Sequence, residues 1–177
     1  MAVLKNDHDS NDFTRISFEL NLTKNDGFDY CPNREDNLNW IPFELKLCVG
    51  EEEKYIYPNE YSVTFSLMEL KNLLANSKKL ISNAKEKIKN HDRYFDDSEL
   101  RLNFYTLERY FGMDIKYAYE SLISMAIWIN MIYSTKGKLY RFEKGFRFKV
   151  SIDDLDKFFD EIEEQLKGIL LTWRNKN

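Results

Sequence analysis

The sequence has little cysteine, glycine and proline, and each scarcity excludes a class of protein. Among 177 residues there are two cysteines, Cys31 and Cys48, too few for a disulfide framework and without the spacing of a zinc motif. Six glycines and three prolines exclude collagen-like and low-complexity chains. No run reaches the roughly 18 to 20 apolar residues of a membrane helix, and the first residues lack the apolar segment of a secretory signal. We therefore expect a cytoplasmic protein that does not contact membranes.

The common signatures of enzymes and metal sites are also missing. The sequence contains no glycine-rich nucleotide-binding loop, no G-x-S-x-G nucleophile motif and no H-E-x-x-H zinc motif. Its two histidines, His8 and His91, each precede an aspartate in a polar stretch, and we expect both on the solvated surface. The sequence therefore predicts no catalytic, cofactor-binding or metal-binding residue.

Apolar and aromatic residues are abundant enough to build a packed core. Hydrophobic residues make up 43% of the chain and aromatic residues 15%, which excludes disorder throughout. The length suits one domain, expected over residues 13–177, preceded by a loose polar tail at residues 1–12. The net charge of −4 gives no basic excess, so the sequence predicts a protein partner rather than a nucleic acid.

Several segments alternate between apolar and polar residues, as half-buried strands do. Pro42 places its segment at a sheet edge or at the start of a strand, because proline has no N–H to donate. Glu143–Gly145 is expected to form a turn. The predicted strands lie at residues 14–22, 39–49, 55–65, 100–108, 115–133 and 138–150. Residues 115–133 predict two strands or one long bent strand, apolar on both faces and therefore central in the sheet or between the sheet and a helix. The alternative is a helix, but the β-branched and aromatic content favours a strand.

Two segments change to the three- and four-residue spacing of amphipathic helices. Residues 66–90 begin with a capping box of Ser66 and Glu69, and their later lysines suit the negative end of the helix dipole. Ser151 and Asp154 start a second helix directly after a strand. Its apolar stripe consists of Ile152, Leu155, Phe159, Ile162, Leu166, Ile169 and Trp173. We predict an α+β fold in the order βββ-α-ββββ-α, with a mostly antiparallel sheet of about seven to eight strands and two helices.

Acidic residues gather in the polar turn at residues 50–54 and on the polar face of the last helix. A solvated helix face with favourable dipole placement explains them, and the alternative is a docking surface for a partner with a basic surface. The candidate partner-binding residues are Glu51, Glu52, Glu53, Asp153, Asp154, Asp156, Asp160, Glu161 and Glu164.

Four stretches, spread over about two thirds of the chain, carry a family resemblance: WIPFELKLCVG, SVTFSLMELKNLL, SELRLNFYTLE and GFRFKVSIDDLDKFFDEIEEQL. Their layout is similar to the WapI-like immunity proteins of bacterial contact-dependent toxin systems. The resemblance implies binding rather than catalysis, namely occlusion of the active site of a cognate toxin, often a nuclease with a basic groove. An acidic surface suits that role through electrostatic complementarity and steered association.

Two other functions stay open on the residues alone. One is a small hydrolytic enzyme with a pair of facing carboxylates, and the other is a structural or regulatory domain without a fixed partner. A deep pocket lined by facing carboxylates favours the enzyme, whereas a flat or shallow acidic face favours the binding protein.

Overall fold

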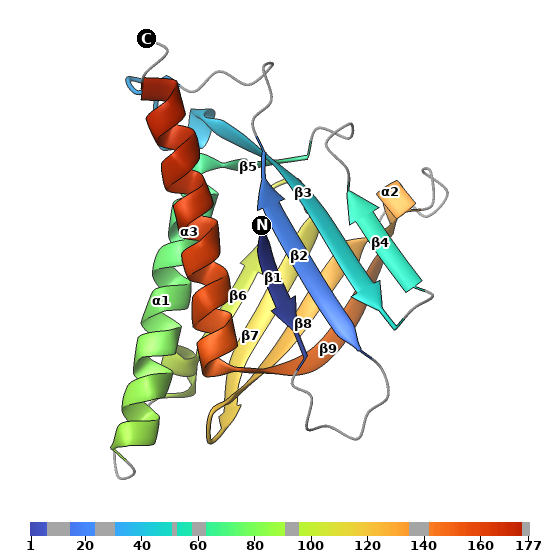
Figure 1. Ribbon diagram of the computed structural model, residues 1–177, viewed down its shortest axis with the longest axis vertical. Coiled ribbons are helices and arrows are strands. Elements are labelled where there is room, and N and C mark those ends of the chain that lie inside the picture. The colour runs from blue at the N-terminus through green and yellow to red at the C-terminus, as the bar shows by residue number, and fades with distance from the viewer. Residues whose placement is uncertain are drawn as a thin grey trace.

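The computed structural model describes residues 1–6, 15–23, 31–50, 53–57, 63–90, 96–134 and 142–174. These residues form two antiparallel sheets that face each other, with two long helices along one side (Figure 1). The predicted α+β class, with strands before each of the two long helices, is confirmed. The sequence predicted one mostly antiparallel sheet of seven to eight strands, whereas the described residues contain nine strands divided between two sheets.

The first sheet is built from the strands that precede the first long helix. Its members are β1 (Ala2–Lys5), β2 (Ile16–Leu22), β3 (Trp40–Val49) and β4 (Glu53–Tyr57), in that order, with β5 (Thr64–Ser66) pairing with the start of β3. In β2 every second residue is buried, as the alternation predicted. Pro42 lies near the start of β3 opposite Thr64. A short 3₁₀ turn, η1 (Asp36–Leu38), leads into β3.

The second sheet follows the first long helix and keeps the order of the sequence. It consists of β6 (Arg101–Tyr105), β7 (Phe111–Tyr119), β8 (Leu122–Asn130) and β9 (Glu143–Ser151). Residues 115–133 thus contribute to two strands, and β8 lies between β7 and β9, central in its sheet as expected. The short helix α2 (Met131–Ser134) ends β8, and the 3₁₀ turn η3 (Asp97–Leu100) precedes β6.

The two long helices, α1 (Leu67–Lys89) and α3 (Ile152–Arg174), lie side by side and antiparallel (Figure 1). α1 packs along β6, and α3 packs along β1 and β2, so the pair covers one side of both sheets. The predicted capping box is present: the Ser66 hydroxyl accepts from the Glu69 N–H, and the Glu69 carboxylate accepts from the Ser66 N–H. No helix in the described ranges combines the length and the hydrophobicity needed to cross a bilayer.

The hydrophobic core lies between the sheets and under the helices. Phe18 of the first sheet meets Phe111 of the second at 6.0 Å between ring centroids, and meets Phe158 of α3 at 5.8 Å. Phe43 and Phe65 approach to 4.4 Å in the same cluster. A fully buried side chain of this size contributes about 1.5 to 3 kcal/mol, so these contacts fix how the three layers meet.

Three local predictions are wrong. Ala2–Lys5, expected in the loose tail of residues 1–12, form β1, because their alternate residues are buried and the strand pairs with β2. The irregular strand of residues 55–65 is two short strands, β4 and β5, that pair with different parts of β3. Glu143–Gly145 is not a turn but the start of β9. There the ring of Trp128 on β8 lies against Gly145, where a Cβ atom would come within 2.5 Å of it.

Candidate partner-binding surface

The polar side of α3 forms an open hollow beside the start of β1, which we call the α3 hollow. It has a volume of about 760 Å³, and five of its eight lining residues are acidic. Because its helical positions are three or four residues apart, they share one face of α3. The lining residues are Met1, Asp153, Asp156, Lys157, Asp160, Glu161, Glu164 and Gln165.

The opposite face of α3 determines this orientation. Leu155, Phe158, Phe159 and Ile162 are at most 1% exposed, so the acidic side must point outward. The helix start is capped as predicted, because the Ser151 hydroxyl accepts from the Asp154 N–H at 3.0 Å and lies 2.7 Å from its carboxylate. At the floor of the hollow, the Gln165 side-chain oxygen accepts from the Leu22 N–H of β2 at 2.7 Å, which holds α3 against the first sheet.

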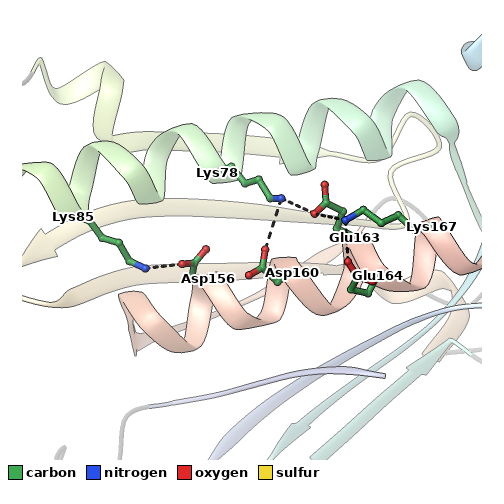
Figure 2. Close-up of polar contacts among 7 residues, drawn as sticks. All are labelled: Lys78, Lys85, Asp156, Asp160, Glu163, Glu164 and Lys167. Carbon is green, nitrogen blue, oxygen red and sulfur yellow. Dashed lines mark hydrogen bonds and ion pairs between the residues drawn. The ribbon is translucent and has the colours of Figure 1, made fainter.

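Lysines of α1 reach across to the acidic side of α3 (Figure 2). Lys78 Nζ lies 2.6 Å from Glu163 Oε2 and 3.7 Å from Asp160 Oδ1. Seven residues, about two turns, further along α1, Lys85 Nζ lies 2.6 Å from Asp156 Oδ2. Pairs of this kind contribute about 0.2 to 1 kcal/mol each. Together they fasten the two antiparallel helices and neutralise part of the acidic surface.

The ion pairs shift the pKa values of Glu163, Lys78 and Lys85. The hydrogen bond from Lys78 holds the pKa of Glu163 below its ordinary value, and a second hydrogen bond from Lys167 acts in the same direction. The same bond raises the pKa of Lys78, and the hydrogen bond to Asp156 raises the pKa of Lys85, although burial opposes both shifts. Glu163, Lys78 and Lys85 therefore keep their charges at neutral pH.

Three carboxylates of the α3 hollow stay largely exposed although each has a lysine nearby. The side chains of Asp153, Asp160 and Glu164 are 91%, 61% and 71% exposed, and they lie 3.4 Å from Lys85, 3.7 Å from Lys78 and 2.9 Å from Lys167, respectively. Since every acidic group of the hollow comes from one face of one helix, no carboxylate faces another across it. Within the described ranges, no group of three or more His, Cys, Asp or Glu side chains is placed to hold a metal ion. The arrangement is a charged surface that a basic partner can reach.

The family match agrees with the resemblance found in the four stretches. A family model described as the immunity protein WapI-like family matches residues 8–169. The chain belongs to the WapI-like immunity protein family. The matched range takes in both sheets from β2 onward, all of α1 and most of α3. No curated protein matches the chain, and neither does any solved structure.

Most of the predicted binding residues of this WapI-like chain come together. Asp153, Asp156, Asp160, Glu161 and Glu164 line the α3 hollow. Asp154 does not line it, and its carboxylate accepts from the Ser151 hydroxyl at the start of α3.

The other singled-out residues lie elsewhere in the WapI-like fold. Glu51, Glu52, His8 and His91 fall outside the described residues, and for Glu53 and Trp173 only the backbone is described. Cys31 and Cys48 are free thiols, each half-buried.

Sequence reasoning missed the partners of these carboxylates. Glu163 was not among the candidates, and the lysines of α1 were assigned to the helix dipole. A signal was present, because Lys71, Lys78 and Lys85 recur every seven residues and therefore share one face of α1. Lys71 pairs in the same way, since its Nζ lies 2.6 Å from Asp36 Oδ2 of η1. In this WapI-like chain the row of lysines serves to bind neighbouring acidic groups.

Proposed function

We propose that this protein neutralises a cognate bacterial toxin in the cytoplasm by binding over the toxin's active surface, and that the α3 hollow makes the contact. Family membership supports the role of immunity protein and hence a toxin as the partner. We choose this surface because five carboxylates from one helix line one open hollow.

The geometry suits binding to a basic surface for two reasons. The ion pairs from Lys78 and Lys85 hold α3 in place before the partner arrives, so little ordering of the helix is needed on association. The outward carboxylates of Asp160, Glu161 and Glu164 then complement cationic side chains such as those of a nuclease groove. Charges of this kind raise the association rate most strongly at low salt.

The acidic run Glu51, Glu52 and Glu53 is a second proposed contact. It lies between β3 and the start of β4, far along the chain from α3, and has to be tested separately.

The proposal is tested by co-expressing the protein with the toxin domain encoded beside it. Growth rescue and a stable purified complex are expected. A charge-reversal variant, Glu161→Lys with Glu164→Lys, should weaken the complex by about tenfold or more, chiefly through slower association, and this loss should shrink at high salt.

The matched control carries Glu99→Lys and Glu108→Lys, two exposed acidic residues outside the α3 hollow that undergo the same change of charge. It should bind within about twofold of the wild type, and far-ultraviolet circular dichroism should show both variants folded. If the wild-type protein neither rescues growth nor forms a complex, the proposed function is wrong. If a complex forms but both variants bind alike, the α3 hollow is not the contact.

A further inference from the structure

The outer face of the second sheet carries the opposite charge to the α3 hollow. The strand register aligns two rows of side chains across β6, β7, β8 and β9 on this face. The first row is Arg101, Lys116, Ser124 and Lys149, and the second is Asn103, Asp114, Ala126 and Arg147. Four cations and one carboxylate give these rows a net charge of +3, in a chain whose net charge is −4.

These cations are accessible. Arg101, Lys116, Arg147 and Lys149 are all exposed. Among the described residues, no carboxylate forms an ion pair with Arg101 or Arg147, whose guanidinium groups each present a planar fork of donors. Seven side chains of the two rows, together with Leu102 and Ile115, line a groove of about 470 Å³. We call it the sheet groove, and it shares no lining residue with the α3 hollow.

The floor of the sheet groove is fixed by its single carboxylate. Asp114 Oδ2 accepts from the Trp128 indole N–H at 2.7 Å, and Oδ1 accepts from the Asn103 side-chain amide. The indole ring is in turn pressed against Gly145. The carboxylate of Asp114 thus holds the floor in place, and the exposed guanidinium groups of Arg101 and Arg147 lie on either side of it.

We propose that the sheet groove binds an acidic, extended segment of a protein partner. Charge complementarity selects the sign of the ligand, and the exposed arginines favour carboxylates that can bind bidentately. β9 lies at the edge of the sheet, and on it Arg147, which lines the groove, is two residues, about 6.8 Å, from Lys149, which is not among the lining residues. An extended segment with an acidic residue at every second position repeats its carboxylates at the same interval.

A single-stranded nucleic acid fits the same face less well. Binding of this kind uses several open aromatic rings on which successive bases stack. Here the ring of Tyr105 has the Arg109 guanidinium 5.8 Å from its centroid, and Tyr119 has the Lys149 ammonium at 4.8 Å. Both rings therefore already have a cation partner. A continuous phosphate backbone crossing the groove also meets Asp114, which carboxylates spaced along a peptide can avoid.

The proposal goes beyond toxin neutralisation and does not depend on it, because the two surfaces share no residue. The test uses a fluorescein-labelled decapeptide of alternating glutamate and threonine, with fluorescence anisotropy at low and physiological salt. A dodecauridylate of the same label is the second probe. Nuclear magnetic resonance of the ¹⁵N-labelled protein locates binding through the Trp128 indole N–H, assigned by its loss in Trp128→Phe.

The peptide is expected to bind and to shift the Trp128 indole resonance. Arg101→Glu with Arg147→Glu should weaken binding at least tenfold. Arg101→Gln with Arg147→Gln removes the same charges without reversing them, and it should also weaken binding, so it replaces the first variant if charge reversal disturbs folding. The matched control, Lys5→Glu with Lys54→Glu, changes two exposed lysines on the outer face of the first sheet and should bind within twofold.

Three results would overturn the proposal. One is an equal loss of affinity in the arginine variant and the lysine control, because the loss would then follow from the change in net charge alone. Another is tighter binding of the dodecauridylate than of the peptide through the same arginines, which would assign the face to nucleic acid. The third is an indole resonance that does not move at saturating peptide. Loss of toxin binding in the α3 variant leaves this test unaffected, so the two proposals fail separately.

Discussion

Replacing Glu69 by glutamine should destabilise the protein more than the removal of an ordinary helix cap. Its side chain is 8% exposed, and its two oxygens accept from two backbone N–H groups: Ser66 at 2.7 Å and Leu107 at 2.6 Å. The first bond closes the start of α1, and the second ties it to the turn between β6 and β7. Glutamine keeps one acceptor oxygen and turns an amide N–H₂ toward the other donor. Losing one charge-assisted bond and leaving a donor unpaired should cost about 2 to 4 kcal/mol.

Urea unfolding followed by circular dichroism measures this cost, provided that the slope of the transition stays unchanged. Ser66→Ala is the matched comparison, because it removes the hydroxyl that accepts from the Glu69 N–H and leaves the carboxylate in place. That variant should lose about 1 kcal/mol. If Glu69→Gln costs no more than Ser66→Ala, the bond to the Leu107 N–H contributes nothing, and the reasoning is refuted.

Three further predictions concern separate contacts. Tyr57→Phe removes a buried hydroxyl that donates to the carbonyl oxygens of Tyr110, just before β7, at 2.9 Å and of Asn130 in β8 at 2.6 Å, and should lower the thermal midpoint by about 2 to 4 °C per kcal/mol lost. Because Lys78 lowers the pKa of Glu163 in the folded state, their pair stabilises the protein above pH 4.5, the ordinary pKa, and the gain disappears as pH falls through the lowered pKa. Between pH 6 and pH 3, the free energy of unfolding measured with urea should therefore fall less in Lys78→Met than in the wild type, by a difference below about 1 kcal/mol. Equal falls in the two proteins would contradict the pairing. Gly168→Ala, with nothing within 4 Å of the added Cβ in α3, should stabilise by about 0.5 to 1 kcal/mol, whereas Gly112→Ala must displace a tyrosine ring 2.4 Å away and should destabilise. Thermal unfolding checks both glycine variants. An unchanged thermal midpoint in Gly112→Ala would show that the tyrosine ring moves aside freely.

Features governed by neighbours in sequence could be predicted from the sequence. The capping residues Ser66 and Ser151 and the apolar stripes that follow them fix the starts and inner faces of α1 and α3. The alternation in β2 and β3 similarly determines which residues are buried. The family resemblance, carried by these same segments, is confirmed over residues 8–169.

Features governed by partners distant in the sequence could not be predicted from the sequence. Ala2–Lys5 is too short to show a period of its own, and becomes a strand through pairing with β2. The split into two sheets depends on which strands pair, which alternation does not encode. Gly145 has the sequence signal of a turn, and only the ring of Trp128 shows why glycine stands within a strand.

The candidate surface shows the same division. Helical spacing predicted that Asp156, Asp160 and Glu161 share a face of α3. It did not show that lysines of α1 pair with some of them, because the register between two helices is set by packing across the core.

The contact of α3 with β1 has a consequence for how the protein is made. Ala2 and Ile152 are 150 positions apart, so a ribosome adding about 5 to 20 residues per second finishes β1 roughly 8 to 30 s before α3 begins. During this interval the outermost strand of the first sheet has no helix beside it, and an unprotected strand edge is where nascent chains aggregate or recruit chaperones. A translation product cut short before α3 would lack the cover of that edge and the acidic hollow together. Incomplete chains would then be recognisable to quality control and unable to compete with finished ones.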